Sequence, residues 1–255
     1  YSATMNPNRG AWLEYETDAS NVFYVRIDKN RKLPVTVLCR ALGLSTNEDI
    51  LNYFGEDERI LATLEKDTTK NQEEGLLEVY RKLRPGEPPT VESATSQINM
   101  LFFDPRRYDL SRFGRYKMNK KLSLARRITG FVAAENIVAP LTGEVIVEAN
   151  GKISRELAEK ADNAGVDTVI LLIEGKKVKV ITNGCVDAQG FFSFDVKECG
   201  INERCSFDEI KKILDTTSDV EEQKEMLRRN HDQLIGRTVT VADILASINY
   251  LNGLG

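Results

Sequence analysis

The feature that most constrains this sequence is a cluster of three prolines in Arg84-Pro-Gly-Glu-Pro-Pro-Thr90. Each proline fixes its own φ and lacks a backbone donor, so no helix continues through this segment. A helix over residues 73–83 is therefore expected to end here, and Thr90 is a suitable N-cap for a second helix. Helical spacing marks the residues that this second helix buries, namely Ile98, Leu101 and Phe102. The cluster is predicted to be a rigid corner between two helices.

A strongly basic segment follows at residues 104–127. It contains nine lysines and arginines against two aspartates, whereas the whole chain of 255 residues has a net charge of −4. A positive segment on an acidic chain is typical of a surface that binds a polyanion. Arginines adjoin aromatic residues at Arg107-Tyr108, Arg112-Phe113 and Arg115-Tyr116, a pattern that supplies phosphate contacts and stacking faces together. The residues alone support equally the alternative that these rings are core and the cations a solvated face.

The composition is that of a globular chain with room for one large or two small domains. No apolar run approaches the ~20 residues of a membrane span, and the first residues are too polar for a signal peptide. We therefore expect a cytoplasmic protein with no membrane partner. Because the chain does not begin with Met and stops directly after an amphipathic run, we expect it to be an excised piece of a longer protein.

Neither a metal site nor a catalytic site is expected. Cys185, Cys199, Cys205 and His231 have spacings that fit no structural-zinc pattern, so free thiols, Cys39 included, are favoured over zinc ligands. The single histidine lies in a polar stretch, and the sequence contains no GxSxG, P-loop or HExxH motif. We expect no catalytic residues, no metal and no cofactor in this chain.

Periodicity and turn chemistry predict an α+β fold class: a mostly helical part with a β-hairpin, carrying a small inserted β-rich α/β module. The predicted domains are 1–126 plus 237–255, and 127–236. Expected strands are 12–16, 22–28, 142–148, 166–173, 176–182 and 191–196. Expected helices are 35–42, 47–54, 57–64, 73–83, one from Thr90, 154–163, 206–214, 218–230 and 240–251. The first and last helical parts are expected to pack together.

Several segments, in this order and with short gaps, resemble the β subunit of bacterial DNA-dependent RNA polymerase. They are Asn8-Arg-Gly-Ala-Trp-Leu-Glu14, Val25-Arg-Ile-Asp-Lys-Asn-Arg-Lys-Leu-Pro34, Leu38-Cys-Arg-Ala-Leu-Gly43, the proline corner, Phe102-Phe-Asp-Pro-Arg-Arg-Tyr-Asp-Leu110 and Gly114-Arg-Tyr-Lys-Met-Asn119. The resemblance covers residues 1–122 and 238–255. Residues 127–236 more loosely resemble a module that some bacterial lineages insert at this point.

The resemblance implies a lobe of the β subunit, one jaw of the cleft that contacts downstream and non-template-strand DNA. Trp12 matches a tryptophan that stacks on an unpaired base, and Asp28 and Lys29 match residues beside the same DNA-binding pocket. The resemblance implies that both bind DNA, since a carboxylate can accept from base amino groups and a lysine can bind phosphate or a guanine edge. Lys29 replaces an arginine of the family, which keeps the charge but loses the planar fork. Arg84 and Arg107 match arginines that contact the strand. The gate loop across the DNA entry channel corresponds to Arg84, Pro85, Gly86, Glu87, Pro88 and Pro89.

The resemblance also implies partners. The intact enzyme is a nucleotidyltransferase whose Mg²⁺ belongs to the β′ subunit, so this piece is expected to be non-catalytic. Expected partners are DNA, the β′, α and ω subunits, sigma factor and, through the insertion, transcription factors, in the cytoplasm at the nucleoid. The alternative function is a protein-interaction module, in which the insertion docks a factor and DNA contact is incidental.

Overall fold

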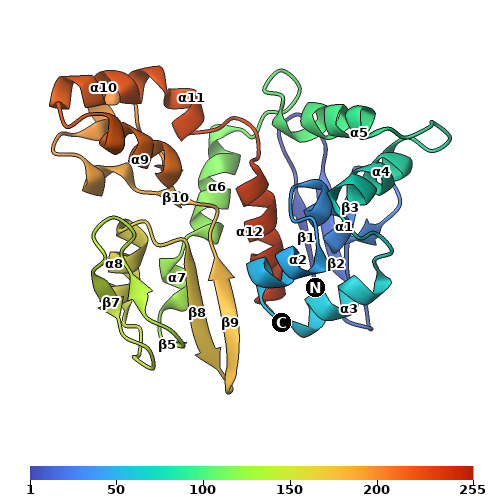
Figure 1. Cartoon of the computed structure of the whole chain (residues 1–255). Helices are drawn as coiled ribbons and strands as arrows, with labels where there is room; N and C mark the ends of the chain where they lie inside the picture. Colours follow the sequence, from blue (N-terminus) through green and yellow to red (C-terminus); the bar gives the residue numbers. More distant parts are fainter. Residues whose placement is uncertain (255) are drawn as a thin grey trace. The chain divides into compact units, whose positions relative to one another are not determined.

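A computed structural model describes residues 1–254 and confirms the α+β class (Figure 1). The chain forms two compact units: unit 1 combines Tyr1–Ser111 with the segment from Thr238 onward, and unit 2 is Arg112–Arg237. The predicted domain boundaries stay a prediction, because compact packing alone does not test where a domain begins. Within residues 1–254, no helix has both the length and the apolar character needed to cross a bilayer.

Unit 1 contains an antiparallel four-stranded sheet in the order β1-β2-β3-β4. Its strands are β1 (Ser2–Met5), β2 (Leu13–Thr17), β3 (Phe23–Ile27) and β4 (Leu33–Pro34). The predicted hairpin is β2 and β3, paired from Leu13↔Ile27 to Thr17↔Phe23. Alternate residues of both strands are buried, as expected for a sheet with one covered face. Strand β1 escaped prediction because its side chains are mostly exposed and carry no apolar alternation.

Six α-helices complete unit 1, each close to its predicted range. They are α1 (Val35–Ala41), α2 (Asn47–Phe54), α3 (Glu58–Lys66), α4 (Gln72–Leu83), α5 (Val91–Ile98) and α12 (Val241–Asn252). Thr90 caps α5 by accepting from the Ser93 N–H, as predicted. The hydroxyls of Tyr15 in β2 and Ser247 in α12 lie 3.1 Å apart within hydrogen-bonding reach. The expected packing of the first and last parts of the chain is thus confirmed.

A π-helix, η1 (Asn99–Phe103), extends α5. Ile98 and Phe102 are buried, as predicted, whereas Leu101 is only partly buried. The wider turn of a π-helix changes which side chains face inward, so a constant 3.6-residue period misplaces one of the three.

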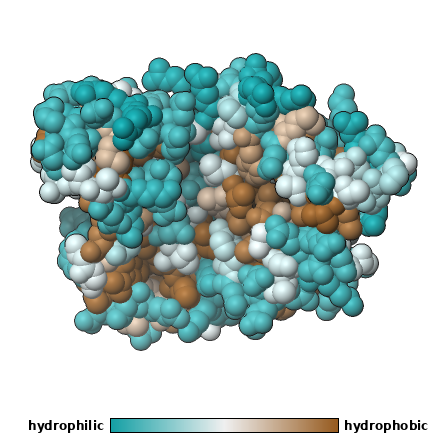
Figure 2. Space-filling view, turned by 45° about the horizontal axis from the view of Figure 1, so that its top comes forward, coloured by the Kyte–Doolittle hydropathy of each residue, from teal (hydrophilic) through white to brown (hydrophobic). Residues whose placement is uncertain are grey.

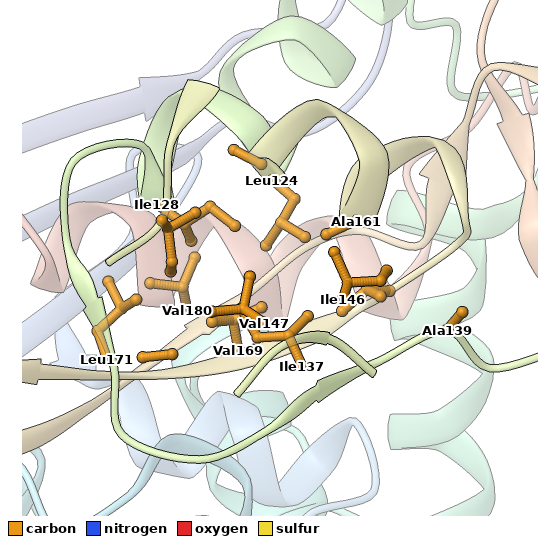
Figure 3. Close-up of a cluster of buried hydrophobic side chains, with 14 residues drawn as sticks. Leu124, Ile128, Ile137, Ala139, Ile146, Val147, Ala161, Val169, Leu171 and Val180 are labelled. Carbon is orange, nitrogen blue, oxygen red and sulfur yellow. The ribbon is translucent and has the colours of Figure 1, made fainter. Parts of the chain in front are cut away.

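The first part of unit 2 folds around one hydrophobic cluster (Figure 3). Strands β5 (Val132–Ala133), β8 (Thr168–Ile173) and β9 (Lys176–Ile181) form one sheet, and β6 (Ile137–Val138) pairs with β7 (Val145–Val147). The accompanying helices are α6 (Arg112–Leu122), α7 (Ala125–Ile128) and α8 (Arg155–Asn163). Ile128, Ala161 and Val169 bring α7, α8 and β8 to the same core. The strands predicted at 166–173 and 176–182 are confirmed as β8 and β9, which pair as a hairpin through Glu174-Gly175.

The second part of unit 2 has its own cluster. It contains β10 (Cys185–Val186), β11 (Cys205–Ser206), the 3-10 helices η2 (Ala188–Phe191) and η3 (Val196–Cys199), and helices α9 (Phe207–Thr216), α10 (Val220–Arg229) and α11 (His231–Leu234). An ion pair between Arg204 and Asp162 joins this part to α8.

The predicted strand at residues 191–196 is wrong. This segment connects η2 to η3, and its hydrogen bonds come from a side chain instead of a neighbouring strand. The Gln189 amide nitrogen donates to the Phe194 carbonyl at 2.8 Å, and its oxygen accepts from the Val196 N–H at 3.0 Å. Asp187 and Asp195 cap the two 3-10 helices. The aromatic residues that suggested a strand therefore pack in the second hydrophobic cluster of unit 2.

Candidate nucleic-acid interface

Trp12 directly precedes β2 and is exposed. The neighbouring residues Ala11 and Leu13 are buried, so the extended chain directs Trp12 to the opposite face. The side chain is 45% exposed. A flat ring in this position offers a stacking surface, and core packing does not account for it.

Two hydrogen bonds join Trp12 to Asp28, which directly follows β3. The Asp28 N–H donates to the Trp12 carbonyl at 2.9 Å, and the Trp12 N–H donates to Asp28 Oδ1 at 2.7 Å. Asp28 has a φ of 55°, in the left-handed region that few residues other than Gly, Asn and Asp adopt readily. The structure thus brings together two of the residues that the sequence singled out.

A basic turn continues from Asp28. The Asn30 amide nitrogen donates to the Ile27 carbonyl at 2.9 Å and closes the turn. Lys29 and Arg31 are exposed, and neither forms an ion pair within residues 1–254. Sequence reasoning selected Lys29 but passed over Arg31, although both belong to one cationic run after the hairpin.

Arg107 lies in a loop that packs against the segment leading to Trp12. Arg9 forms a β-bridge with Asp109, in which the Asp109 N–H donates to the Arg9 carbonyl at 2.8 Å, and the Asn8 N–H donates to the Asp109 carbonyl at 2.9 Å. Gly10 lies directly against the Tyr108 ring, where an added Cβ would come within 2.6 Å of Tyr108 Cδ2. The loop that carries Arg107 is therefore fixed against Gly10, which lies two residues before Trp12 in the chain.

Asp104 organises the start of this loop. Its carboxylate accepts from Arg106 Nε at 3.1 Å and from a second Arg106 nitrogen at 3.0 Å. The hydrogen bonds from Arg106 lower the pKa of Asp104 below its usual value. The Arg107 backbone N–H donates to the Asp104 carbonyl at 3.0 Å, and its exposed guanidinium forms no ion pair within residues 1–254. Arg106 is held by its neighbour, whereas Arg107 is available to a ligand.

A cleft of about 1120 Å³ lies beside this loop. Residues of α5, η1 and the Asp104–Arg107 loop line it, and Arg107 stands at its border. Trp12, Asp28, Lys29 and Arg84 do not line it. The cleft therefore shares only one residue with the site predicted from the sequence.

Arg84 ends α4 and opens the gate loop, which projects between α4 and α5 (Figure 1). Its guanidinium lies 3.8 Å from the Glu87 carboxylate. Within residues 1–254, no hydrogen bond or ion pair links Arg84 to Trp12 or Arg107. The structure therefore connects Trp12, Asp28 and the Arg107 loop by contacts, and leaves Arg84 in a separate element of unit 1.

The aromatic residues of the basic segment have different environments. Tyr108 is buried, whereas Phe113 and Tyr116 on α6 are 65% and 49% exposed. Lys117 lies 4.5 Å from the Phe113 ring centroid, and Lys120 lies 5.9 Å from that of Tyr116. The face of the molecule drawn in Figure 2 is largely hydrophilic, with several apolar patches. Tyr108 is therefore a core residue, as one alternative expected, whereas a nucleic-acid role for the exposed rings stays a prediction.

Arg115 does not belong to the exposed basic surface that the sequence predicted. It is buried on α6 and donates to the Gly236 carbonyl at 3.3 Å, so its charge is not displayed with the others. The basic segment is also divided, because Arg106 and Arg107 belong to unit 1 and α6 belongs to unit 2.

The described residues offer no alternative metal chemistry. Within residues 1–254, no group of three His, Cys, Asp or Glu side chains is arranged to hold an ion. Cys39, Cys199 and Cys205 are free and buried, and Cys185 is partly exposed. The arrangement around Trp12 is an exposed ring, whose backbone is bonded to Asp28, at the end of the β2–β3 hairpin from which the cationic turn continues.

Comparison with known proteins places the chain in a family. The model of RNA polymerase Rpb2, domain 2, matches residues 1–137. The DNA-directed RNA polymerase subunit beta of Acetivibrio thermocellus is 56% identical over 256 residues, covering 100% of this chain and 20% of the relative. Those of Clostridium beijerinckii and Clostridioides difficile are each 54% identical, covering 100% and 98% of this chain and 21% and 20% of the relatives.

The chain thus spans about a fifth of the length of these relatives. Residues 127–236, whose resemblance to the inserted module was loose, are included in the matches to all three of these relatives. The comparisons confirm the resemblance to the bacterial β subunit, and the chain belongs to the family of RNA polymerase Rpb2, domain 2.

Proposed function

We propose that this chain is part of the β subunit of a bacterial DNA-directed RNA polymerase and forms a non-catalytic lobe. In this role it is one jaw of the cleft that contacts downstream DNA and the separated non-template strand. The observation that carries the proposal is the exposed Trp12 ring, held by Asp28 at the end of a hairpin whose following turn is cationic.

The chemistry around Trp12 suits an unpaired strand. Every base has a π-face, so stacking on a tryptophan is tolerant of sequence and is worth about 1–3 kcal/mol per base. Lys29, Arg31 and Arg107 have exposed cationic side chains that can neutralise phosphates. Binding through such contacts releases counterions and therefore weakens steeply as salt rises.

The remaining roles follow from the intact enzyme. Within it the chain would belong to a nucleotidyltransferase whose Mg²⁺ lies in the β′ subunit, so this chain needs no cofactor. We propose the β′, α and ω subunits, sigma factor and DNA as its partners, in the cytoplasm at the nucleoid. Arg84 and the gate loop would border the DNA entry channel, where a proline-restricted corner resists displacement.

A binding assay on the 255-residue chain tests the proposal. Fluorescence anisotropy with a labelled oligo-dT strand is expected to show weak binding that falls steeply between low and moderate salt. Trp12→Ala combined with Arg107→Ala should abolish it. The matched control combines Phe131→Ala and Arg155→Ala, an exposed ring and an exposed arginine of unit 2. Unchanged affinity in the Trp12/Arg107 variant, or an equal loss in the control, would contradict the proposal.

The alternative function, docking of a protein factor, also has a specific observation in its favour. The β6–β7 hairpin of unit 2 exposes Val138, Leu141 and Val145. The exposed carboxylates of Glu135 and Glu144 are paired with Lys177 and Lys160, which leaves the apolar side chains as the distinguishing feature of the hairpin. An exposed apolar group of this kind suits a partner surface that is mainly apolar.

Variants of the hairpin separate the two functions. Leu141→Ser with Val145→Ser should reduce recruitment of such a factor to the assembled polymerase while oligo-dT binding persists. A photo-crosslinker at position 141 should join the same factor to the intact enzyme. If the crosslinks reach only DNA, the docking function is wrong.

A further inference from the structure

We infer that Asp28 is a positioning residue, whose carboxylate fixes the backbone of Trp12 and so presents the ring. The inference rests on the proposed function in one respect, namely that the Trp12 ring is a stacking surface. The evidence for it lies entirely in contacts within unit 1.

The Trp12–Asp28 contact lies where the next residue pair of the β2–β3 ladder would form. Leu13↔Ile27 is the last regular pair, and the Asp28 N–H still donates to the Trp12 carbonyl at 2.9 Å. In a regular antiparallel pair of this kind, the return bond would run from the Trp12 N–H to the Asp28 carbonyl. Here the Trp12 N–H donates to Asp28 Oδ1 at 2.7 Å instead. The side chain has replaced its own main-chain carbonyl.

The backbone conformation of Asp28 explains this replacement. With φ at 55°, the chain leaves the strand geometry at this residue and turns toward Lys29. Its carbonyl is therefore no longer directed along the ladder. Asp and Asn combine tolerance of this conformation with a side-chain oxygen that can reach a nearby backbone N–H. Gly tolerates the conformation but has no acceptor.

The closed pair of hydrogen bonds has a consequence for recognition. It fixes the Cα of Trp12, and a ring whose position is fixed before binding loses less freedom when a base stacks on it. Oδ1 of the Asp28 carboxylate is engaged at 2.7 Å, so this oxygen is committed to the protein. The turn that begins at Asp28 then carries Lys29 and Arg31.

The composition of the chain allows a direct test, because Trp12 is its single tryptophan. Its emission maximum and anisotropy can be measured without DNA in wild type, Asp28→Asn and Asp28→Gly. We expect Asp28→Asn to resemble wild type, since it keeps an oxygen acceptor. Asp28→Gly should shift the emission to longer wavelength and lower its anisotropy, and its affinity for oligo-dT should fall about tenfold, the effect of one charge-assisted hydrogen bond.

A matched control lies two residues further along the same turn. Asn30→Gly removes the hydrogen bond from its side chain to the Ile27 carbonyl but leaves the Trp12–Asp28 contact in place. Its tryptophan signals should equal those of wild type. Circular dichroism establishes that each variant is folded, and the Asp28→Asn variant keeps the test decisive if Asp28→Gly does not fold.

The possible outcomes separate this inference from the proposed function. If Asp28→Gly has wild-type tryptophan signals, or if both Asp28 variants lose oligo-dT affinity equally with those signals unchanged, Asp28 is not a positioning residue. A marked change of signals in a folded Asp28→Asn variant would also overturn the inference. If the signals change as expected but wild type binds no oligo-dT, the positioning role stands and the proposed function fails.

Discussion

The Tyr80 hydroxyl donates a hydrogen bond of 2.8 Å to Glu87, which ties the gate loop to the last turns of α4. The same carboxylate lies 3.8 Å from the guanidinium of Arg84. The hydrogen bond to Glu87 raises the pKa of Tyr80, because it stabilises the protonated phenol beside an anion. One acidic side chain thus restrains the proline corner and also partly neutralises the arginine that the family resemblance assigns to DNA.

Replacing Glu87 should strengthen anion binding at Arg84. In Glu87→Gln the arginine loses its nearby carboxylate, so affinity for oligo-dT at low salt should rise about twofold, within the range of an exposed ion pair. The gain should disappear at high salt. The control is Glu78→Gln, which frees Arg81 from an i,i+3 pair of 3.2 Å on α4. An equal rise in both variants would show that total charge, and not Arg84, is responsible.

Local signals in the sequence predicted most of the secondary structure. Capping residues such as Thr46, Thr90 and Thr240 fix the first turn of a helix through their own side chains, so their effect is readable from neighbouring residues. The hairpin turns at 18–21 and 174–175 are local for the same reason. The sequence also marked Trp12 and Asp28, although only through the family resemblance.

What the sequence could not reveal depends on contacts between distant residues. The bridge between Arg9 and Asp109 joins positions a hundred residues apart, and no local pattern predicts it. The strand expected at residues 191–196 failed because the side chain of Gln189 satisfies the backbone there. The environments of Tyr108 and Tyr116 differ although both follow an arginine, since burial is decided by tertiary packing.

A buried ion pair in unit 1 should be essential for its stability. Arg40 and Asp67 are 1% and 0% exposed, with Arg40 Nε 3.1 Å from Asp67 Oδ2. Asp67→Asn leaves the buried arginine without its counter-charge and should destabilise unit 1 by about 3–5 kcal/mol. Urea unfolding followed by Trp12 fluorescence measures this unit specifically, because the chain has no tryptophan elsewhere.

An exposed pair of unit 1 is the control for this experiment. Arg81 and Glu78 lie 3.2 Å apart on the surface of α4. Glu78→Gln should change stability by less than about 1 kcal/mol, because solvent screens an exposed pair. If Asp67→Asn is as mild as Glu78→Gln, the buried network is dispensable and our interpretation of it is wrong.

The buried thiol of Cys39 should make unit 1 less stable at alkaline pH. Burial raises the pKa of Cys39 from 9.0 to about 12. Below pH 9 the thiol is protonated in both the folded and unfolded states. Above pH 9, only the unfolded chain readily loses the thiol proton of Cys39, so the free energy of unfolding falls as the pH rises from 9 toward 12.

The variant Cys39→Ala isolates this contribution. The fall in melting temperature between pH 8 and a pH near 10.5, followed by Trp12 fluorescence, should be smaller in Cys39→Ala than in wild type, since other titrating groups are common to both. A parallel test uses a thiol reagent at pH 8. The partly exposed Cys185 should react before Cys39 and Cys205, whose pKa burial also raises to about 12. An identical pH dependence in both proteins would contradict the assignment.

The contact between Gly10 and Tyr108 should couple stability to DNA binding, because it fixes the Arg107 loop beside the segment that leads to Trp12. Gly10 has a φ of +122°, and an added Cβ would lie 2.6 Å from Tyr108 Cδ2. Gly10→Ala therefore combines backbone strain with a steric clash, and the loop must move away. We expect a loss of several kcal/mol in unfolding free energy, of the order of 2–4, and a clear loss of oligo-dT affinity.

Gly43 provides a closely matched control, since its φ is +125° and no atom lies within 4 Å of an added Cβ. In Gly43→Ala only the backbone strain should lower the unfolding free energy, by about 1–2 kcal/mol, and oligo-dT affinity should be unchanged. The comparison therefore separates the conformational cost of alanine at positive φ from the loss of the Tyr108 contact. Equal losses of affinity in the two variants would mean that general destabilisation, and not displacement of the Arg107 loop, weakens binding.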